Sequence, residues 1–252
     1  MQLQNKTFII TGATSGMGRA IAIQFARAGA NIVANGRAEQ KGVQLLRKLQ
    51  AIHPRVHFIA GDVGQAATNE QLVEEAIAKF GRLDGIITNA GTLGLGNVRD
   101  LAISDWHQTF DTNLHALFYL SKYAIPHLQK QGGIILANAS IAAFKSFPNH
   151  PAYCASKAAV VSLVKQMALD YGPAIRVNAI CPGPVDTPMI WDSAKAFSEP
   201  HKIVEQVAND TLMKRLGTPE DIAELALFLA STKASWMTGV SVTIDGGIMA
   251  SR

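Results

Sequence analysis

The sequence predicts an α/β fold: a doubly wound, seven-stranded parallel sheet with helices on both faces. Two observations predict it. Short runs rich in β-branched residues alternate with longer stretches of helical period along the chain, which is the pattern of βαβ units. A glycine-rich turn separates the first run from a helical stretch, as in the opening unit of such sheets. With 252 residues, 48% of them apolar, and no linker or repeat, residues 1–252 are expected to form one domain.

The strands and helices follow in strict alternation. We expect strands near residues 7–11, 31–34, 56–60, 85–88, 133–138, 176–180 and 240–244. We expect helices over residues 15–28, 39–51, 69–80, 104–130, 153–171 and 219–229. Parallel strands that are covered on both sides read as continuous apolar runs, and the predicted strands have this character.

One stretch, from Cys181 to Thr218, breaks the alternation. It is rich in proline and too long for a plain connection, so we expect it to be irregular. Loops of this length in compact domains are usually functional. We therefore interpret residues 184–217 as a lid over a site.

Charge and cysteine content exclude several classes of protein. The 23 basic and 19 acidic residues are spread along the chain without a block of like charge, which argues against a nucleic-acid partner. Cys154 and Cys181 are too few for a disulfide framework and match no cysteine-rich zinc motif, so a reducing, cytoplasmic location is expected. We see no secretory signal and no apolar run of about 18 residues, so we expect no membrane partner.

The glycine turn is the first candidate binding feature. It reads Thr11-Gly-Ala-Thr-Ser-Gly-Met-Gly18 and leads into the first predicted helix. Gly12 suits a tight turn, Gly16 lets a pyrophosphate approach the main chain, and Gly18 lets helix and strand pack closely. The helix start then offers free N–H donors. Asn89-Ala90-Gly91 ends the fourth predicted strand, where the crevice of such a sheet should open.

The end of the second strand bears on which dinucleotide binds. It reads Asn35-Gly36-Arg37 and lacks the acidic residue that would take the ribose hydroxyls of NAD. Arg37 offers a forked cation suited to a 2′-phosphate, and Gly36 leaves room for it. NADP is therefore favoured. NAD stays possible if Arg37 is a plain surface residue and Asn35 bonds the ribose.

Tyr153 and Lys157 are the first candidate catalytic pair. Four residues apart on a helix, they share a face that continues through apolar valines, a poor place for an unpartnered ammonium. A phenol can give a proton to a developing alkoxide, and a nearby ammonium would favour the phenolate for the reverse step. A surface lysine beside a packed tyrosine remains the alternative.

Two further polar residues complete the candidate set. Ser140 closes the fifth predicted strand, where its hydroxyl could hold a substrate oxygen or simply form a turn. Asn113 lies in the stripe of Trp106, Phe110 and Leu117, which we expect to face the core. A buried amide needs partners, either backbone and water or a water that relays protons to Lys157.

A metal site is not expected. His53 and His57 form the only suggestive pair, and on an extended strand four residues span about 13 Å, too far for one zinc ion to bridge.

Together these motifs resemble the classical short-chain dehydrogenase/reductase family, which has a Rossmann-type fold. The resemblance rests on the glycine turn, Asn89-Ala-Gly91, Asn113, Ser140, Tyr153-x3-Lys157 and Pro182-Gly183, and it covers essentially the whole chain. It implies an NAD(P)-dependent enzyme that moves hydride between the nicotinamide and a ketone or secondary alcohol.

The resemblance also implies roles for single residues. It makes Tyr153 the acid/base, with Lys157 lowering its pKa and binding the nicotinamide ribose, Ser140 positioning the carbonyl and Asn113 anchoring the relay. The cofactor residues it implies, with those of the turn, are Gly12, Ser15, Gly16, Met17, Gly18, Arg37, Asp62, Val63, Asn89, Ala90, Gly91, Tyr153, Lys157, Pro182, Gly183, Val185 and Thr187. The substrate residues it implies are Ser140, Ala142, His150, Tyr153, Met189 and Trp191, with Leu93, Leu95, Ala143, Ile190 and Phe197 as further wall residues.

Departures from the family pattern are few. Ser15 stands where many NADP-dependent members carry a basic residue, so the NADP prediction rests on Arg37. The resemblance further implies homotetramers built through the two long helices and the Asp245-Gly246-Gly247 region. A 3-oxoacyl-carrier-protein reductase, a glucose-type sugar dehydrogenase and a non-enzymatic dinucleotide sensor remain alternatives to a carbonyl reductase or alcohol dehydrogenase of small apolar substrates.

Overall fold

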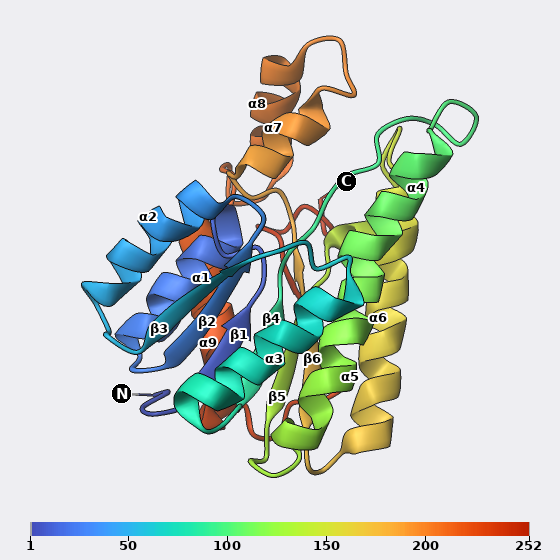
Figure 1. The fold of residues 1–252 in the computed structure, drawn as a ribbon. Coiled ribbons are helices and arrows are strands. Elements are labelled where there is room, and N and C mark those ends of the chain that lie inside the picture. The colour runs from blue at the N-terminus through green and yellow to red at the C-terminus, as the bar shows by residue number, and fades with distance from the viewer. Residues whose placement is uncertain (1, 252) are drawn as a thin grey trace.

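Seven parallel strands form one sheet in the computed structural model, which describes residues 2–251, in the order β3-β2-β1-β4-β5-β6-β7 (Figure 1). The strands are β1 (Thr7–Ile10), β2 (Asn31–Gly36), β3 (Val56–Ala60), β4 (Gly85–Thr88), β5 (Ile134–Asn138), β6 (Arg176–Pro182) and β7 (Ser241–Ile244). The order reverses between β1 and β4, which are hydrogen-bonded neighbours. This is the topological switch point, where a crevice opens at the carboxyl ends of the strands.

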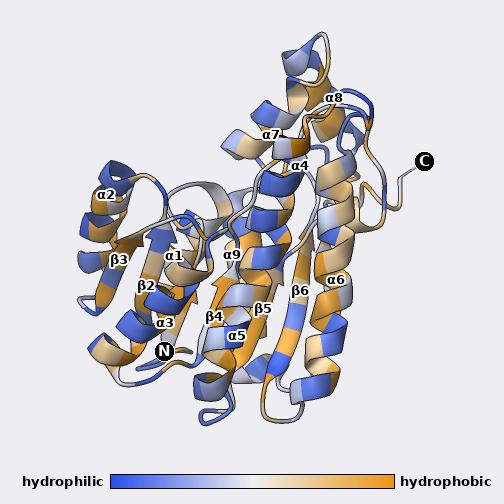
Figure 2. Ribbon diagram, turned by 45° about the vertical axis from the view of Figure 1, so that its right-hand side comes forward, coloured by the Kyte–Doolittle hydropathy of each residue, from blue (hydrophilic) through white to orange (hydrophobic). Residues whose placement is uncertain are grey.

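Helices cover both faces of the sheet, as predicted. They are α1 (Gly16–Arg27), α2 (Glu39–Gln50), α3 (Ala66–Phe80), α4 (Ile103–Phe110), α5 (Ala116–Leu128), α6 (Pro151–Tyr171), α7 (Pro188–Ala194), α8 (Pro200–Asp210) and α9 (Pro219–Ala230). The buried side chains of α1, α2 and α9 form one cluster with the sheet, and those of α3, α5 and α6 form the other. The strands accordingly lie as a hydrophobic layer between helices of mixed character (Figure 2).

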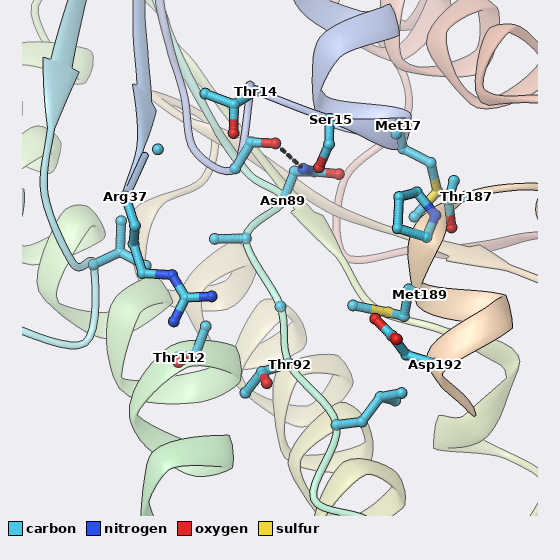
Figure 3. Close-up of a pocket in the computed structure, with 18 of the residues that line it drawn as sticks. Thr14, Ser15, Met17, Arg37, Asn89, Thr92, Thr112, Thr187, Met189 and Asp192 are labelled. Atoms are coloured by element: carbon cyan, nitrogen blue, oxygen red, sulfur yellow. Dashed lines mark hydrogen bonds between the residues drawn. The ribbon is translucent and has the colours of Figure 1, made fainter. Parts of the chain in front are cut away.

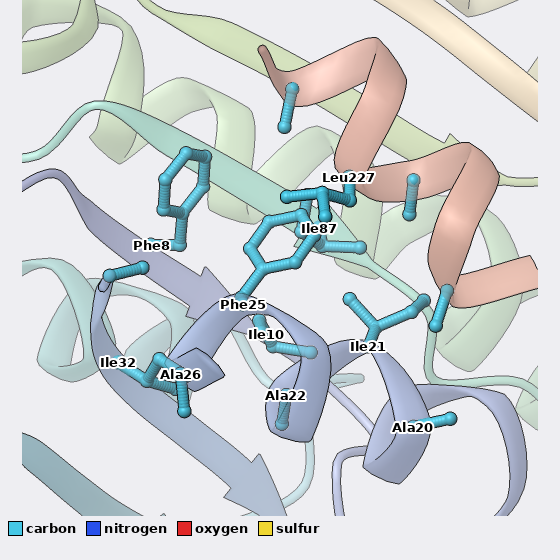
Figure 4. Close-up of a cluster of buried hydrophobic side chains, with 14 of the residues drawn as sticks. Phe8, Ile10, Ala20, Ile21, Ala22, Phe25, Ala26, Ile32, Ile87 and Leu227 are labelled. Atoms are coloured by element: carbon cyan, nitrogen blue, oxygen red, sulfur yellow. The ribbon is translucent and has the colours of Figure 1, made fainter. Parts of the chain in front are cut away.

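The first cluster sets the position of α1, the helix that follows the glycine turn. Phe8 of β1 meets Phe25 of α1 edge to face, with ring centroids 5.0 Å apart, beside Leu227 of α9 (Figure 4). Ile21 and several alanines fill the rest of the inner surface of α1. The small side chains of the alanines let α1 pack closely on both the sheet and α9, which holds the start of α1 at the end of β1.

The predicted helix over residues 104–130 is interrupted. A π-helical turn, Asp111–His115, separates α4 from α5. Only α5 lies on the sheet, whereas α4 projects beyond its carboxyl edge (Figure 1). The prediction that Trp106 faces the core is therefore wrong: its side chain is 37% exposed, while Leu117 is buried as expected.

The stretch after β6 is more regular than predicted. It contains α7 and α8, which stand above the carboxyl edge of the sheet (Figure 1). Each begins at a proline, which suits the first turn of a helix because that position needs no N–H donor. The prolines thus start helices here and do not prevent them. Across residues 2–251, none of the helices combines the length and apolar character needed to cross a bilayer.

Candidate active site

A large cleft lies at the switch point, with a volume of about 750 Å³ (Figure 3). Its walls are the segments that follow β1 to β4, together with the start of α7. Eleven of the predicted cofactor residues line it: Gly12, Ser15, Gly16, Met17, Arg37, Asp62, Val63, Asn89, Ala90, Gly91 and Thr187. Sequence analysis missed other lining residues, notably Thr14, Lys41, Asp192 and Lys195.

The glycine turn forms the floor of this cleft. Gly12 and Gly16 both have positive φ values, +62° and +49°, which residues with a side chain rarely adopt. Gly18 does not line the cleft. It packs against the Gly12 carbonyl, in agreement with the close contact of helix and strand expected at this position. The Thr11 hydroxyl accepts hydrogen bonds from the backbone N–H groups of Asn89 (3.0 Å) and Ala90 (3.1 Å). The turn is thereby fixed to the end of β4.

Two basic side chains stand at the end of the cleft beside β2. Arg37 extends its guanidinium group into the cleft from the end of β2 (Figure 3). Lys41, in the first turn of α2, lines the same region, and a second cation in the helix turn that directly follows Arg37 was the signal that could have identified it. Asn35 instead donates to the carbonyl oxygens of Ile59 and Gly61, each at 3.2 Å. Its amide N–H groups are thus used to join β2 to β3.

A smaller cavity of about 190 Å³ adjoins the cleft. Its lining is mostly apolar and comes from β6, the lid segment and the loop before α6. Among the predicted substrate residues, Ser140, His150, Tyr153, Met189, Leu93, Ile190 and Phe197 line it. Pro182, Gly183 and Val185, predicted for the cofactor, also lie here, whereas Thr187 and Met189 border both spaces.

Three predicted wall residues lie elsewhere. Within residues 2–251, Ala142, Ala143 and Trp191 are outside the lining of both spaces, and Leu95 lines only the larger cleft. Ala142 is buried in the short turn after Ser140. Trp191 turns outward, where its indole N–H donates to Asp186 at 3.2 Å and its ring lies against that of His201 at a tilt of 53°.

Of the candidate catalytic residues, Ser140 and Tyr153 line the small cavity, whereas Lys157 and Asn113 are buried and line neither space. The Ser140 oxygen accepts from the Ala142 N–H at 3.1 Å. The Lys157 ammonium lies 5.7 Å from the centroid of the Tyr153 ring and donates to the Asn138 carbonyl oxygen at 2.7 Å. The predicted polar partner of this buried lysine is therefore a backbone carbonyl at the end of β5.

Burial controls the titration of both groups. Desolvation raises the pKa of Tyr153, and the hydrogen bond with Ser140 opposes this rise only in part. Desolvation also lowers the pKa of Lys157 to about 8. The protein's own groups thus leave the pKa of Tyr153 above its ordinary value. A lower value, as the sequence predicts, requires more positive charge beside the ring.

Asn113 lies in the π-helical turn and is 5% exposed. Its Oδ1 accepts from the Thr92 N–H at 2.9 Å, and its Nδ2 donates to the Thr92 carbonyl and the Ser156 hydroxyl, both at 3.0 Å. The amide therefore joins the segment after β4 to α6 immediately before Lys157. Both of its N–H groups are used by the protein, and a role for it in holding a relay water stays a prediction.

The lid helix α7 separates the two spaces. Met189 borders both spaces, and Asp192, with Lys195 just after the helix, lines the larger cleft. Ile190, Ser193 and Ala194 face the small cavity. One short helix thus contacts both the cleft and the cavity, because its opposite faces border different spaces.

Histidines far from this site have their own partners. His53 lies 3.4 Å from the Asn31 side chain, and His57 lies 3.6 Å from the Glu75 carboxylate. No group of three or more metal-binding side chains occurs among residues 2–251.

Known proteins resemble this chain over nearly its whole length. The family model described as enoyl-(acyl carrier protein) reductase matches residues 12–249. An uncharacterized oxidoreductase of Thermotoga maritima is 38% identical over 249 residues, which cover 98% of each chain. A 3β-hydroxysteroid dehydrogenase of Mediterraneibacter gnavus is 35% identical over 263 residues, which cover 98% of this chain and 95% of that one.

A solved structure agrees with these relatives. The short-chain dehydrogenase/reductase from Brucella melitensis, titled glucose/ribitol dehydrogenase, superposes with a TM-score of 0.91 at 33% identity and covers 98% of both chains. The matches span nearly the full length and include the glycine turn and the Tyr153–Lys157 helix. The chain therefore belongs to the classical short-chain dehydrogenase/reductase family, nicotinamide-dependent oxidoreductases that act on alcohol and ketone groups.

Proposed function

We propose that this protein transfers hydride reversibly between NADP(H) and a ketone or secondary alcohol of a small apolar molecule, with Tyr153 as the general acid/base. One observation carries the proposal. Ser140 and Tyr153 both line an apolar cavity that shares Thr187 and Met189 with the larger cleft. A reacting carbon in the cavity would therefore lie beside a cofactor in the cleft.

The residues of the cleft fit a dinucleotide. Its volume of about 750 Å³ is in the range of cofactor sites. Gly12 has no space for a side chain, because a Cβ would come within 2.8 Å of the Ala90 Cα. Main-chain N–H groups at the start of α1 suit the pyrophosphate, while Asp62 and Val63 suit the adenine and Gly91 the nicotinamide half. When bound, the nicotinamide supplies or accepts the hydride.

Ser140 and Tyr153 act on the substrate oxygen. The Ser140 oxygen accepts from the Ala142 N–H, which leaves its own O–H available as a donor to the substrate. Together the two hydroxyls hold the carbonyl oxygen. In reduction Tyr153 gives its proton to the developing alkoxide, and in oxidation it takes the proton of the alcohol.

Lys157 and Asn113 support this step in different ways. Lys157 places positive charge near the Tyr153 ring, which favours the phenolate, and its ammonium can also reach a ribose hydroxyl next to Gly91. Asn113 does not touch the reacting groups. It positions the segment after β4 against α6, and so acts as a positioning residue for Lys157.

The preference for NADP rests on charge at the end of β2. Arg37 and Lys41 both line the cleft there, and Arg37 stands directly after β2, where NAD-binding sheets carry an acidic residue. Two cations suit a 2′-phosphate, which NAD lacks. Because the Asn35 N–H groups are occupied, the amide of Asn35 is a poor donor to a plain ribose.

The size and lining of the small cavity favour compact apolar substrates. At about 190 Å³ it is below the range of pockets for drug-sized ligands. A steroid, the substrate named for the Mediterraneibacter relative, would need the lid to move. The apolar lining also disfavours a free sugar. The presence of Ser140 and Tyr153 in one cavity argues against a sensor without activity.

Three further features belong to this proposal. Residues 184–217, with α7 and α8, act as the lid. The protein assembles as a homotetramer through α5, α6 and the C-terminal region, which is supported by exposed apolar side chains at Phe118, Leu169 and Trp236. The free thiols of Cys154 and Cys181 suit a cytoplasmic location.

A screen with both cofactors tests the function. Purified protein is mixed with NADPH or NADH and a panel of ketones, and with NADP⁺ or NAD⁺ and the matching alcohols, while absorbance of the reduced cofactor is followed. We expect turnover of small cyclic ketones with NADPH in preference to NADH. NADPH binding without turnover of any substrate would instead identify a dinucleotide sensor.

A further inference from the structure

The small cavity contains a buried polar side chain, His150, that the proposed chemistry does not use. His150 lines the cavity and is only 4% exposed. It lies at the start of α6, one helical turn before Tyr153, and the two ring centroids are 6.4 Å apart. A buried imidazole in an apolar wall needs hydrogen-bond partners on both nitrogens.

The partners of His150 define which nitrogen carries the proton. Nδ1 lies 2.6 Å from the Pro148 carbonyl oxygen, which can only accept, so Nδ1 is the donor. In the neutral ring Nε2 is then an acceptor. Its partner is the Ser193 hydroxyl at 2.8 Å, which donates to it. Ser193 belongs to α7 of the lid and also lines the cavity.

A group of the substrate can replace Ser193 as the partner of His150. A hydroxyl on the substrate can take the place of the Ser193 hydroxyl at Nε2 without leaving that nitrogen unpaired. Ser193 then donates to the oxygen of the same hydroxyl, so that one hydrogen bond is gained. A methyl group cannot take that place, and an ether or carbonyl oxygen offers no proton. The site therefore distinguishes donors from acceptors of similar size.

His150 also lies close to the groups that hold the reacting oxygen. In the proposed function, Ser140 and Tyr153 hold the reacting oxygen at one end of the cavity. The centroid of the His150 ring lies 6.4 Å from that of the Tyr153 ring. Building on the proposed function, we infer that His150 Nε2 accepts a hydrogen bond from a hydroxyl of the substrate. The preferred substrates are then compact hydroxyketones, or the corresponding diols, with the second oxygen across a small ring from the reacting carbon.

Three matched ketones test this inference: 4-hydroxycyclohexanone, 4-methylcyclohexanone and 4-methoxycyclohexanone, each with NADPH. The readout is kcat/KM for the hydroxyl compound divided by that for the methyl compound. In the wild type we expect a ratio of about 3 to 10, the worth of one net hydrogen bond. The methoxy compound should show no gain over the methyl compound.

Two variants separate a substrate contact from a lid contact. His150→Leu should bring the ratio to about 1 or below. Ser193→Ala should raise it by roughly a further fivefold or more, because the methyl compound then leaves Nε2 unpaired whereas the hydroxyl compound satisfies it. Ser198→Ala, on the exposed part of the lid, is the matched control and should leave the ratio unchanged. Thermal unfolding and NADPH affinity are measured for each variant to confirm folding.

Several outcomes would overturn the inference. They are a wild-type ratio near 1, an equal gain for the methoxy compound, or a Ser193→Ala variant that loses the same factor on all three ketones, as a simple lid contact would. Binding of 1,4-cyclohexanediol and 4-methylcyclohexanol in the presence of NADP⁺ is measured by calorimetry in parallel. If no ketone is turned over, the proposed function fails, and this calorimetric preference still decides the role of His150.

Discussion

The ammonium of Lys157 donates a hydrogen bond to the backbone carbonyl of Asn138 at a distance of 2.7 Å. This contact joins the middle of α6 to the last residue of β5. Ser140 follows Asn138 by two residues, and Tyr153 precedes Lys157 by one helical turn. The lysine therefore holds in register the two elements that carry the candidate catalytic hydroxyls.

The same lysine makes stability depend on pH. Its pKa is about 8 in the folded protein and 10.5 for an ordinary lysine, as in the unfolded chain, so between these pH values the unfolded chain binds one proton more. The free energy of unfolding should rise with pH over this window, by roughly 3 kcal/mol at most. We expect the difference in free energy of unfolding between wild type and Lys157→Met, measured in urea, to increase from pH 8 to 10.5. A difference that stays constant would contradict a desolvated Lys157.

Tyr153→Phe tests the acid/base. Removing the phenol proton should lower kcat by at least about 100-fold, since general acid catalysis is worth that much or more. NADPH affinity, measured by fluorescence titration, should change little. Tyr119→Phe, on α5 and outside both cavities, is the matched control and should keep full activity. Near wild-type turnover of Tyr153→Phe would remove Tyr153 from this role.

Arg37→Ala and Lys41→Ala test the cofactor preference. Arg37→Ala should weaken NADPH binding by about 1.5–3 kcal/mol, the worth of a charged hydrogen bond, and Lys41→Ala should weaken it by a smaller amount. NADH binding should be nearly unaffected because it lacks the 2′-phosphate. Lys48→Ala, at the far end of α2, is the control. Equal losses for the two cofactors, measured by calorimetry, would refute a 2′-phosphate site.

Gly18→Ala tests the close approach of α1 to the glycine turn. A Cβ at residue 18 would overlap the Gly12 carbonyl oxygen and the Asn89 amide, so the turn must shift. We expect a loss of about 1–3 kcal/mol in stability, as for overpacking, together with weaker NADPH binding. Gly81→Ala has free space and bears only the strain of φ +75°, so it should lose about 1 kcal/mol and keep its NADPH affinity. Unchanged NADPH affinity in Gly18→Ala would show that the turn tolerates the shift.

The alternation of strands and helices could be predicted from the sequence because each element is long enough to show its hydrophobic pattern. All seven strands were placed within two residues of their ends, since strands buried on both faces are continuous apolar runs. The lid was harder. Helices α7 and α8 were not predicted, because proline disrupts the interior of a helix. Pro188 and Pro200 instead occupy the first turns of these helices, where proline is tolerated.

The apolar stripe over residues 104–130 shows what helical periodicity cannot predict. Helical period places residues on a common face but does not say where the sheet ends. Trp106 lies on the part of the helix that projects past the sheet, and the π-helical turn at Asn113 shifts the faces relative to one another. Neither fact has a signature in local sequence.

The sequence by itself determined the order of the elements, the glycine turn and the one-turn spacing of Tyr153 and Lys157, because these depend on backbone preferences and on residues close in the chain. Only the tertiary structure decided which distant groups meet. Lys157 bonds the Asn138 carbonyl, Asn113 clamps Thr92 to Ser156, Lys41 joins Arg37 at the cleft, and Ser193 of the lid bonds His150. These pairings depend on how helices pack across the carboxyl edge of the sheet, which is set by the sum of many side-chain contacts and by no single local motif.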